Sequence, residues 1–149
     1  MSRETMRAAV YREKGTLEVV EVELPRIGPS EVLVEVEYCG VCGTALHDVL
    51  DGWGVPDSVG GHEWSGQVVE AGSDTSLEVG ALVVGYPGTW CCRCSACQAG
   101  RPNLCEVRPV AGVEKTHGAF ADYVVVDGDR AMVAPTGICL LYTSDAADE

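Results

Sequence analysis

The chain has 149 residues, of which 46% are hydrophobic and 22% charged, so it is long enough for one globular domain with a hydrophobic core and is neither disordered nor fibrous. Its 23 acidic residues outnumber its 10 basic residues, which gives a formal net charge of −13. This charge repels nucleic acid and anionic membrane surfaces, so neither is expected as a partner.

The first segments of the chain are strand-like. Segments 6–11 and 16–25 flank Gly15, which predicts a turn and therefore a hairpin. Segment 31–38 alternates apolar and acidic residues with period two. It predicts a strand with one buried face and with three glutamates facing water, Glu31, Glu35 and Glu37.

A short helix is expected at 44–50, before the glycine-rich sequence DGWGVPDSVGG. We interpret Gly52-Trp53-Gly54 within it as either a turn or a loop near a substrate cleft. The core is the expected place of all three tryptophans, Trp53, Trp64 and Trp90. Further strands are expected at 65–74, 81–86, 118–127 and 131–135. Many short strands separated by turns are typical of a β-barrel or sandwich, not of alternating strands and helices.

The last eleven residues, CLLYTSDAADE, differ in style from the rest. Back-translated, they resemble the end of a transposase adapter used in DNA library preparation, read in frame. We therefore expect 139–149 to be a non-native tail and 1–138 to be the native domain; a genuine polar C-terminus is the alternative. The sequence has no G-x-G-x-x-G after a strand, so it shows no dinucleotide-binding motif.

The start of the chain, MSRETMRAAV, lacks the apolar segment of a secretory signal, and no apolar run approaches the roughly 20 residues that span a bilayer. A cytoplasmic protein is therefore expected. In a reducing compartment its eight cysteines are expected to be metal ligands or thiols, not disulfides.

Five cysteines fall within residues 91–105. Cys91, Cys94, Cys97 and Cys105 form a C-x2-C-x2-C-x7-C series that suits a closed, tetrahedral and therefore structural zinc site. Cys92 is expected to be a spare thiol. An iron–sulfur cluster is the alternative, because bacterial ferredoxins also begin C-x2-C-x2-C. In those proteins, however, the last spacer is shorter and proline follows, where this chain has Glu106.

Two further fragments, CGVCGTALH at 39–47 and GGHEWSG at 60–66, hold a second set of ligand types. Its candidates are the thiolates of Cys39 and Cys42, the imidazoles of His47 and His62, and the carboxylate of Glu63. Cys42 and His62 are twenty residues apart, so only the tertiary fold can bring them together.

In this order, the three motifs strongly resemble the zinc-dependent medium-chain dehydrogenases/reductases, the alcohol dehydrogenase superfamily. The resemblance covers residues 6 to about 138. It implies a mainly β fold, a GroES-like partly open β-barrel with a short helix and a cysteine-rich zinc lobe at about 88–108. It also implies a small alcohol or carbonyl substrate, a homo-oligomer when the protein is complete, and two zinc ions, one catalytic and one structural.

Carried over residue by residue, the resemblance makes Cys42 and His62 ligands of the catalytic zinc, with Glu63 as the acidic residue that touches the metal in some members. Cys39 matches a non-ligand position. Thr44 and His47 match the groups that relay the alcohol proton toward water, a task suited to imidazole, which titrates near pH 6.5. His117 has no match and is interpreted as a loop histidine.

The resemblance implies an oxidoreductase that interconverts an alcohol or polyol and its aldehyde or ketone by hydride transfer with NAD or NADP. The family's remaining zinc ligand and its nucleotide-binding domain have no counterpart here. The resemblance therefore implies a domain truncated before the cofactor domain, and the chain alone is expected to be inactive. Ala45 replaces an aspartate that commonly supports the zinc-binding histidine, so a looser catalytic zinc is expected. A zinc-stabilised binding or scaffold module without catalysis is the alternative.

Overall fold

The computed structural model describes residues 4–85, 90–91, 93–107, 118–135 and 137–139. The predictions for Cys92, for His117 and for most of the segment 139–149 lie outside these residues. None of the helices in the described part has the length and apolar character that a membrane crossing requires.

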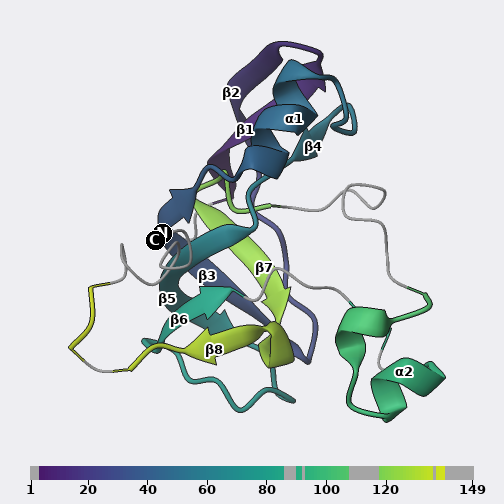
Figure 1. The fold of residues 1–149 in the computed structure, drawn as a ribbon. Helices are drawn as coiled ribbons and strands as arrows, with labels where there is room; N and C mark the ends of the chain where they lie inside the picture. The colour runs from purple at the N-terminus through teal and green to yellow at the C-terminus, as the bar shows by residue number, and fades with distance from the viewer. Residues whose placement is uncertain (1–3, 86–89, 92, 108–117, 136, 140–149) are drawn as a thin grey trace.

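The fold is mainly β, as predicted, and has two antiparallel sheets (Figure 1). The small sheet has the order β2-β1-β4 and the larger sheet the order β7-β3-β5-β6-β8. The strands are β1 (Thr5–Glu13), β2 (Thr16–Glu23), β3 (Glu31–Gly40), β4 (Ser58–Val59), β5 (Glu63–Ala71), β6 (Leu82–Gly85), β7 (Tyr123–Asp127) and β8 (Ala131–Val133). Because β7 and β8 end the larger sheet without pairing with each other, the curled sheet is a partly open barrel.

Four short helices complete the described chain: α1 (Gly43–Leu50), α2 (Ser95–Gln98), and the 3-10 helices η1 (Pro102–Leu104) and η2 (Gly128–Arg130). In Figure 1, α1 lies beside the β1–β2 hairpin at the top, whereas α2 lies in a separate lobe at the lower right. The expected helix at 44–50 is thus confirmed to within one residue.

Valines form most of the core of the larger sheet, since β-branched side chains pack well on a pleated surface. Val32, Val34, Val68 and Val83 are buried there with Trp64. A smaller cluster of Ala8, Val10 and Val59 lies under the hairpin.

Two predictions about side-chain burial are wrong. Leu33 is buried together with its neighbours Val32 and Val34. The start of β3 is therefore covered on both faces of the sheet. Glu35 and Glu37 are exposed, as predicted, whereas Glu31 is half-buried: its Oε2 accepts a hydrogen bond from the Gly28 N–H at 2.6 Å. Trp53 is not in the core, because 66% of it is exposed.

Candidate metal centres

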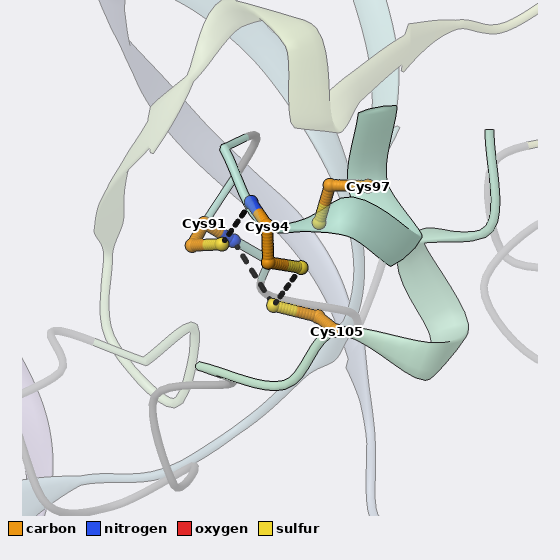
Figure 2. Close-up of side chains that lie close together, drawn as sticks. All are labelled: Cys91, Cys94, Cys97 and Cys105. Atoms are coloured by element: carbon orange, nitrogen blue, oxygen red, sulfur yellow. Dashed lines mark hydrogen bonds between the residues drawn. The ribbon is translucent and has the colours of Figure 1, made fainter. Parts of the chain in front are cut away.

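Within the described residues, two groups of side chains have donor atoms close enough to hold a metal ion. The first is the predicted four-cysteine cluster, in which all sulfur atoms lie within 4.8 Å of one another (Figure 2). Cys94 is the N-cap of α2, Cys97 lies within α2, and Cys105 is the C-cap of η1. The two short helices thus return the chain so that the distant Cys105 meets its partners.

The spacing of the thiols fits a tetrahedral zinc ion. Zn–S bonds of about 2.3 Å place the sulfurs of a tetrahedron roughly 3.8 Å apart. The Sγ atoms of Cys94 and Cys105 are 4.0 Å apart. Backbone amides also point at the sulfurs: the Cys91 N–H donates to Cys105 Sγ and the Cys94 N–H to Cys91 Sγ, each at 3.3 Å. The donor set therefore suits a closed zinc site.

Backbone amides around the cluster favour the deprotonated thiolate form of its cysteines, which is the form that binds metal. Hydrogen bonds from the backbone of Cys97 and then of Glu106 lower the pKa of Cys94 from 9.0 to about 6. The pKa of Cys91 is also lowered, chiefly by a hydrogen bond from the backbone of Arg93. Because the thiolate is the form that binds metal, the cluster is prepared for a cation.

Arg130 attaches the four-cysteine lobe to the larger sheet. Its Nη2 donates to the backbone oxygen of Trp90 at 3.3 Å, and its guanidinium lies 5.6 Å from the centroid of the Trp90 ring. Asp127 holds the same guanidinium at 3.5 Å. A cation over an indole is a favourable contact, so Arg130 holds the chain just before Cys91 in place.

The second group comprises Cys42, His62 and Glu63, whose donor atoms also lie within 4.8 Å of one another. His62 Nε2 and Glu63 Oε1 are 4.0 Å apart. All three residues are half-buried. A thiolate, an imidazole and a carboxylate are all common zinc ligands, and three protein ligands leave a fourth position open. The structure thus brings together the residues that the sequence separates.

Strand pairing explains this meeting. β3 and β5 are antiparallel, and Gly40 at the end of β3 lies opposite Glu63 at the start of β5. The residues just after β3 therefore face the residues just before β5, which places Cys42 beside His62. The register shifts between Val36 and Tyr38, an irregularity that redirects the last part of the strand.

Two glycines make room at this junction. A Cβ at Gly40 would lie 2.9 Å from Glu63 Oε2, so any side chain there would displace the carboxylate. Gly61 has a φ of +95°, and a Cβ on it would lie 2.6 Å from the backbone nitrogen of Phe120. The backbone can turn into His62 only because this position lacks a side chain.

Cys39 is close to this group but is not one of its donors. Its thiol is half-buried and donates to the Gly40 carbonyl at 3.8 Å. Burial, and then the nearby carboxylate of Glu63, raise the pKa of Cys39 to about 11. A thiol that stays protonated is a poor metal ligand, which agrees with the non-ligand position expected from the sequence.

The His62 ring has no hydrogen-bond partner among the described residues; its Nε2 lies 4.0 Å from Glu63 Oε1. Ala45, on α1, is buried and offers only a methyl group. A metal-binding histidine is usually oriented by an acceptor on its other ring nitrogen. The expectation of a loosely held metal at this group therefore remains a prediction.

Thr44 and His47 lie on α1, directly after Cys42. The Cys42 thiol is 3.8 Å from Thr44 Oγ1. His47 Nδ1 is 2.5 Å from Asp51 Oδ2, and its ring stacks on Trp53 with 4.7 Å between centroids and 20° between planes. Sequence reasoning missed Asp51, although its i,i+4 spacing from His47 is the usual spacing of facing side chains on a helix.

Residues 28–136 match the family model of the alcohol dehydrogenase GroES-like domain. L-threonine 3-dehydrogenase of Caldanaerobacter subterraneus subsp. tengcongensis is 40% identical over 136 residues, which is 87% of this chain and 39% of that protein.

Solved structures are similar as well. A cobalt- and zinc-bound thermostable alcohol dehydrogenase from Pyrobaculum aerophilum aligns with a TM-score of 0.81 and 35% identity, over 91% of this chain and 43% of that one. Acetophenone reductase from Geotrichum candidum NBRC 4597, in complex with NAD, aligns with a TM-score of 0.81 and 28% identity, over 94% and 43%. The chain spans about two fifths of the length of the curated relatives it matches.

Proposed function

Because the chain belongs to the family of alcohol dehydrogenase GroES-like domains, we propose that it is the zinc-binding catalytic domain of an NAD(P)-dependent oxidoreductase. The reaction is the interconversion of an alcohol or polyol and its aldehyde or ketone. The observation that carries the proposal is the meeting of Cys42, His62 and Glu63, with the Thr44 hydroxyl 3.8 Å from the Cys42 sulfur.

The donor sets give the two groups different roles. Four thiolates fill a tetrahedral shell, so Cys91, Cys94, Cys97 and Cys105 hold a structural zinc. Cys42, His62 and Glu63 leave a position open, and zinc bound there would supply a Lewis acid for a substrate oxygen.

Thr44 and His47 move the proton. The Thr44 hydroxyl lies 3.8 Å from the Cys42 sulfur, where it can take the proton of a substrate hydroxyl. We assign the next step, transfer toward the His47 ring, from the place of both residues on α1, three positions apart. His47 is largely exposed and can pass that proton to water.

The hydride acceptor is assigned to a part of the protein beyond this chain. Hydride transfer needs a nicotinamide, and the chain has no glycine-rich nucleotide-binding motif. Relatives are more than twice as long, and related structures hold NAD, NADH or NADP. L-Threonine is the first substrate to test, because curated relatives 36–42% identical to this chain are named L-threonine 3-dehydrogenase.

The test compares the 149-residue chain with a longer protein completed by a nucleotide-binding domain. We expect the longer protein to reduce NAD or NADP with at least one of L-threonine, simple alcohols or polyols, and the shorter chain to show no turnover. Cys42→Ser should abolish activity and preserve the fold. Cys39→Ser, three residues away and outside the donor set, is the matched control and should retain activity.

Two outcomes would contradict the proposal. Turnover by the 149-residue chain alone would show that no further domain supplies the cofactor site. The scaffold alternative would be favoured if the completed protein folds but is inactive with every alcohol tested, and if Cys42→Ser leaves its fold and its binding of other molecules unchanged.

A further inference from the structure

We propose that Asp51 and Trp53 are positioning residues for His47: the carboxylate selects the ring tautomer that can accept a proton, and the indole fixes the plane of the ring. The inference rests on the proposed function, in which His47 receives the proton from Thr44. Neither residue is part of the donor groups described above.

Asp51 is placed by the end of α1. It is the C-cap of the helix, and its backbone N–H donates to the His47 carbonyl at 3.0 Å. This brings its side chain back over the last turn, where Oδ2 lies 2.5 Å from His47 Nδ1. Asp51 and His47, one helical turn apart, thus contact each other through both a backbone and a side-chain hydrogen bond.

The contact determines which ring nitrogen carries the hydrogen. An ionised carboxylate has no proton to donate, so the hydrogen of this bond belongs to Nδ1 of His47. Nε2 of the neutral ring then has a free lone pair. When Thr44 gives its proton to Nε2, the Oγ–H bond breaks, an Nε2–H bond forms, and the positive charge of the imidazolium lies beside Asp51.

Trp53 is placed by its flanking glycines. Gly52 has a φ of +84°, and a Cβ on Gly54 would lie 3.0 Å from Cδ1 of Tyr11 and 3.1 Å from the Asp48 carbonyl. The Gly54 N–H donates to that carbonyl at 3.0 Å, which turns the loop back onto α1. The indole therefore lies over the imidazole, although 66% of Trp53 is exposed.

Stability does not account for this arrangement. The side chains of His47 and Asp51 are 55% and 49% exposed, and an ion pair at such a surface contributes little to folding. An exposed indole is also unfavourable in water. What the contacts do is restrict the rotation and tautomer of one imidazole on α1, the helix that begins directly after Cys42.

The first test is the tautomer of His47 by long-range ¹H–¹⁵N correlation on the ¹⁵N-labelled chain, which has only three histidines. At pH 8 the unmodified chain should show the Nδ1–H form. Asp51→Ala should convert it to a mixture rich in Nε2–H, whereas Asp51→Asn, which keeps an acceptor oxygen, should retain Nδ1–H. Asp48→Ala, which removes a neighbouring carboxylate on the same helix, is the control. An unchanged tautomer in Asp51→Ala would overturn the proposal.

The second test is kinetic and uses the longer protein. Asp51→Ala should lower kcat by about 10-fold and leave KM within about twofold. We take the size from metal-binding histidines, for which loss of the orienting partner typically costs about 10- to 100-fold. Trp53→Leu should lower kcat in the same sense, and Asp48→Ala should not. A changed tautomer with unchanged kcat would overturn the positioning role. A longer protein without any turnover would instead overturn the proposed function, whatever the tautomer.

Discussion

At the scale of single residues, Cys94 and Cys39 have opposite electrostatic surroundings. Backbone amides point at Cys94 and lower its pKa to about 6, whereas burial and a nearby carboxylate raise that of Cys39 to about 11. Metal binding requires the deprotonated thiol. The environment of Cys94 therefore favours the form of the thiol that binds metal, whereas the environment of Cys39 opposes it.

This contrast predicts thiol reactivity in the reduced, zinc-free chain. Iodoacetamide reacts with thiolates, so Cys94 should be alkylated at pH 7, with a rate that falls by half near pH 6. Cys39 should remain unmodified at pH 7 to 9. Peptide mass spectrometry reads each site, and the exposed Cys139 reports general accessibility. Equal modification of Cys39 and Cys94 at pH 7 would contradict the assignment.

The same shift affects the stability of the zinc-free chain. In the unfolded chain Cys94 has its ordinary pKa of 9.0, above the folded value, so between about pH 6 and 9 the unfolded state binds more protons. The contribution of this thiolate to stability is thus complete above pH 9. It is lost as the pH falls through about 6.

At the scale of elements, the junction of β3 and β5 depends on the empty space at Gly61. A Cβ there would meet the backbone of Phe120 and Ala119 and the Cys39 sulfur, each at 3.0 Å or less. Gly80 has a similar φ of +93° but no atom within 4 Å of the same Cβ position. A side chain at Gly80 would therefore meet only backbone strain, whereas a side chain at Gly61 would meet both backbone strain and lack of space.

Replacing each with alanine tests this difference. Gly80→Ala should lower the free energy of unfolding by about 1 kcal/mol, because only the left-handed backbone is penalised. Gly61→Ala should cost about 1–3 kcal/mol more through overpacking, and should also weaken zinc binding at Cys42, His62 and Glu63. Urea denaturation and zinc titration give the two quantities. Equal losses for both variants would show that the junction tolerates a side chain.

The elements also show what the sequence could predict. The four-cysteine cluster could be identified directly from the sequence, because its cysteines lie within fifteen residues and two short helices suffice to bring their thiols together. Cys42 and His62 could be linked only through a family resemblance, since their meeting depends on the β3–β5 register. The two-sided burial at the start of β3 and the exposure of Trp53 depend on packing by distant strands and loops, and periodicity carries no information about either.

At the scale of the whole molecule, the two candidate metal centres lie in different parts of the fold. The cysteine lobe is joined to the larger sheet through Trp90 and Arg130, and lies away from α1 in Figure 1. The group of Cys42, His62 and Glu63 lies where β3, α1 and β5 meet. With zinc bound at both groups, as we propose, this separation would let one metal stabilise a lobe while the other keeps an open coordination position.

We therefore propose that the chain binds two zinc ions in two independent ways. Elemental analysis of the chain after zinc loading and desalting tests it most directly. The account predicts two zinc equivalents per chain, of which mild chelation removes the one held by Cys42 first, and one equivalent in Cys42→Ser. Less than one equivalent in the unmodified chain, or a zinc content that Cys42→Ser leaves unchanged, would contradict it.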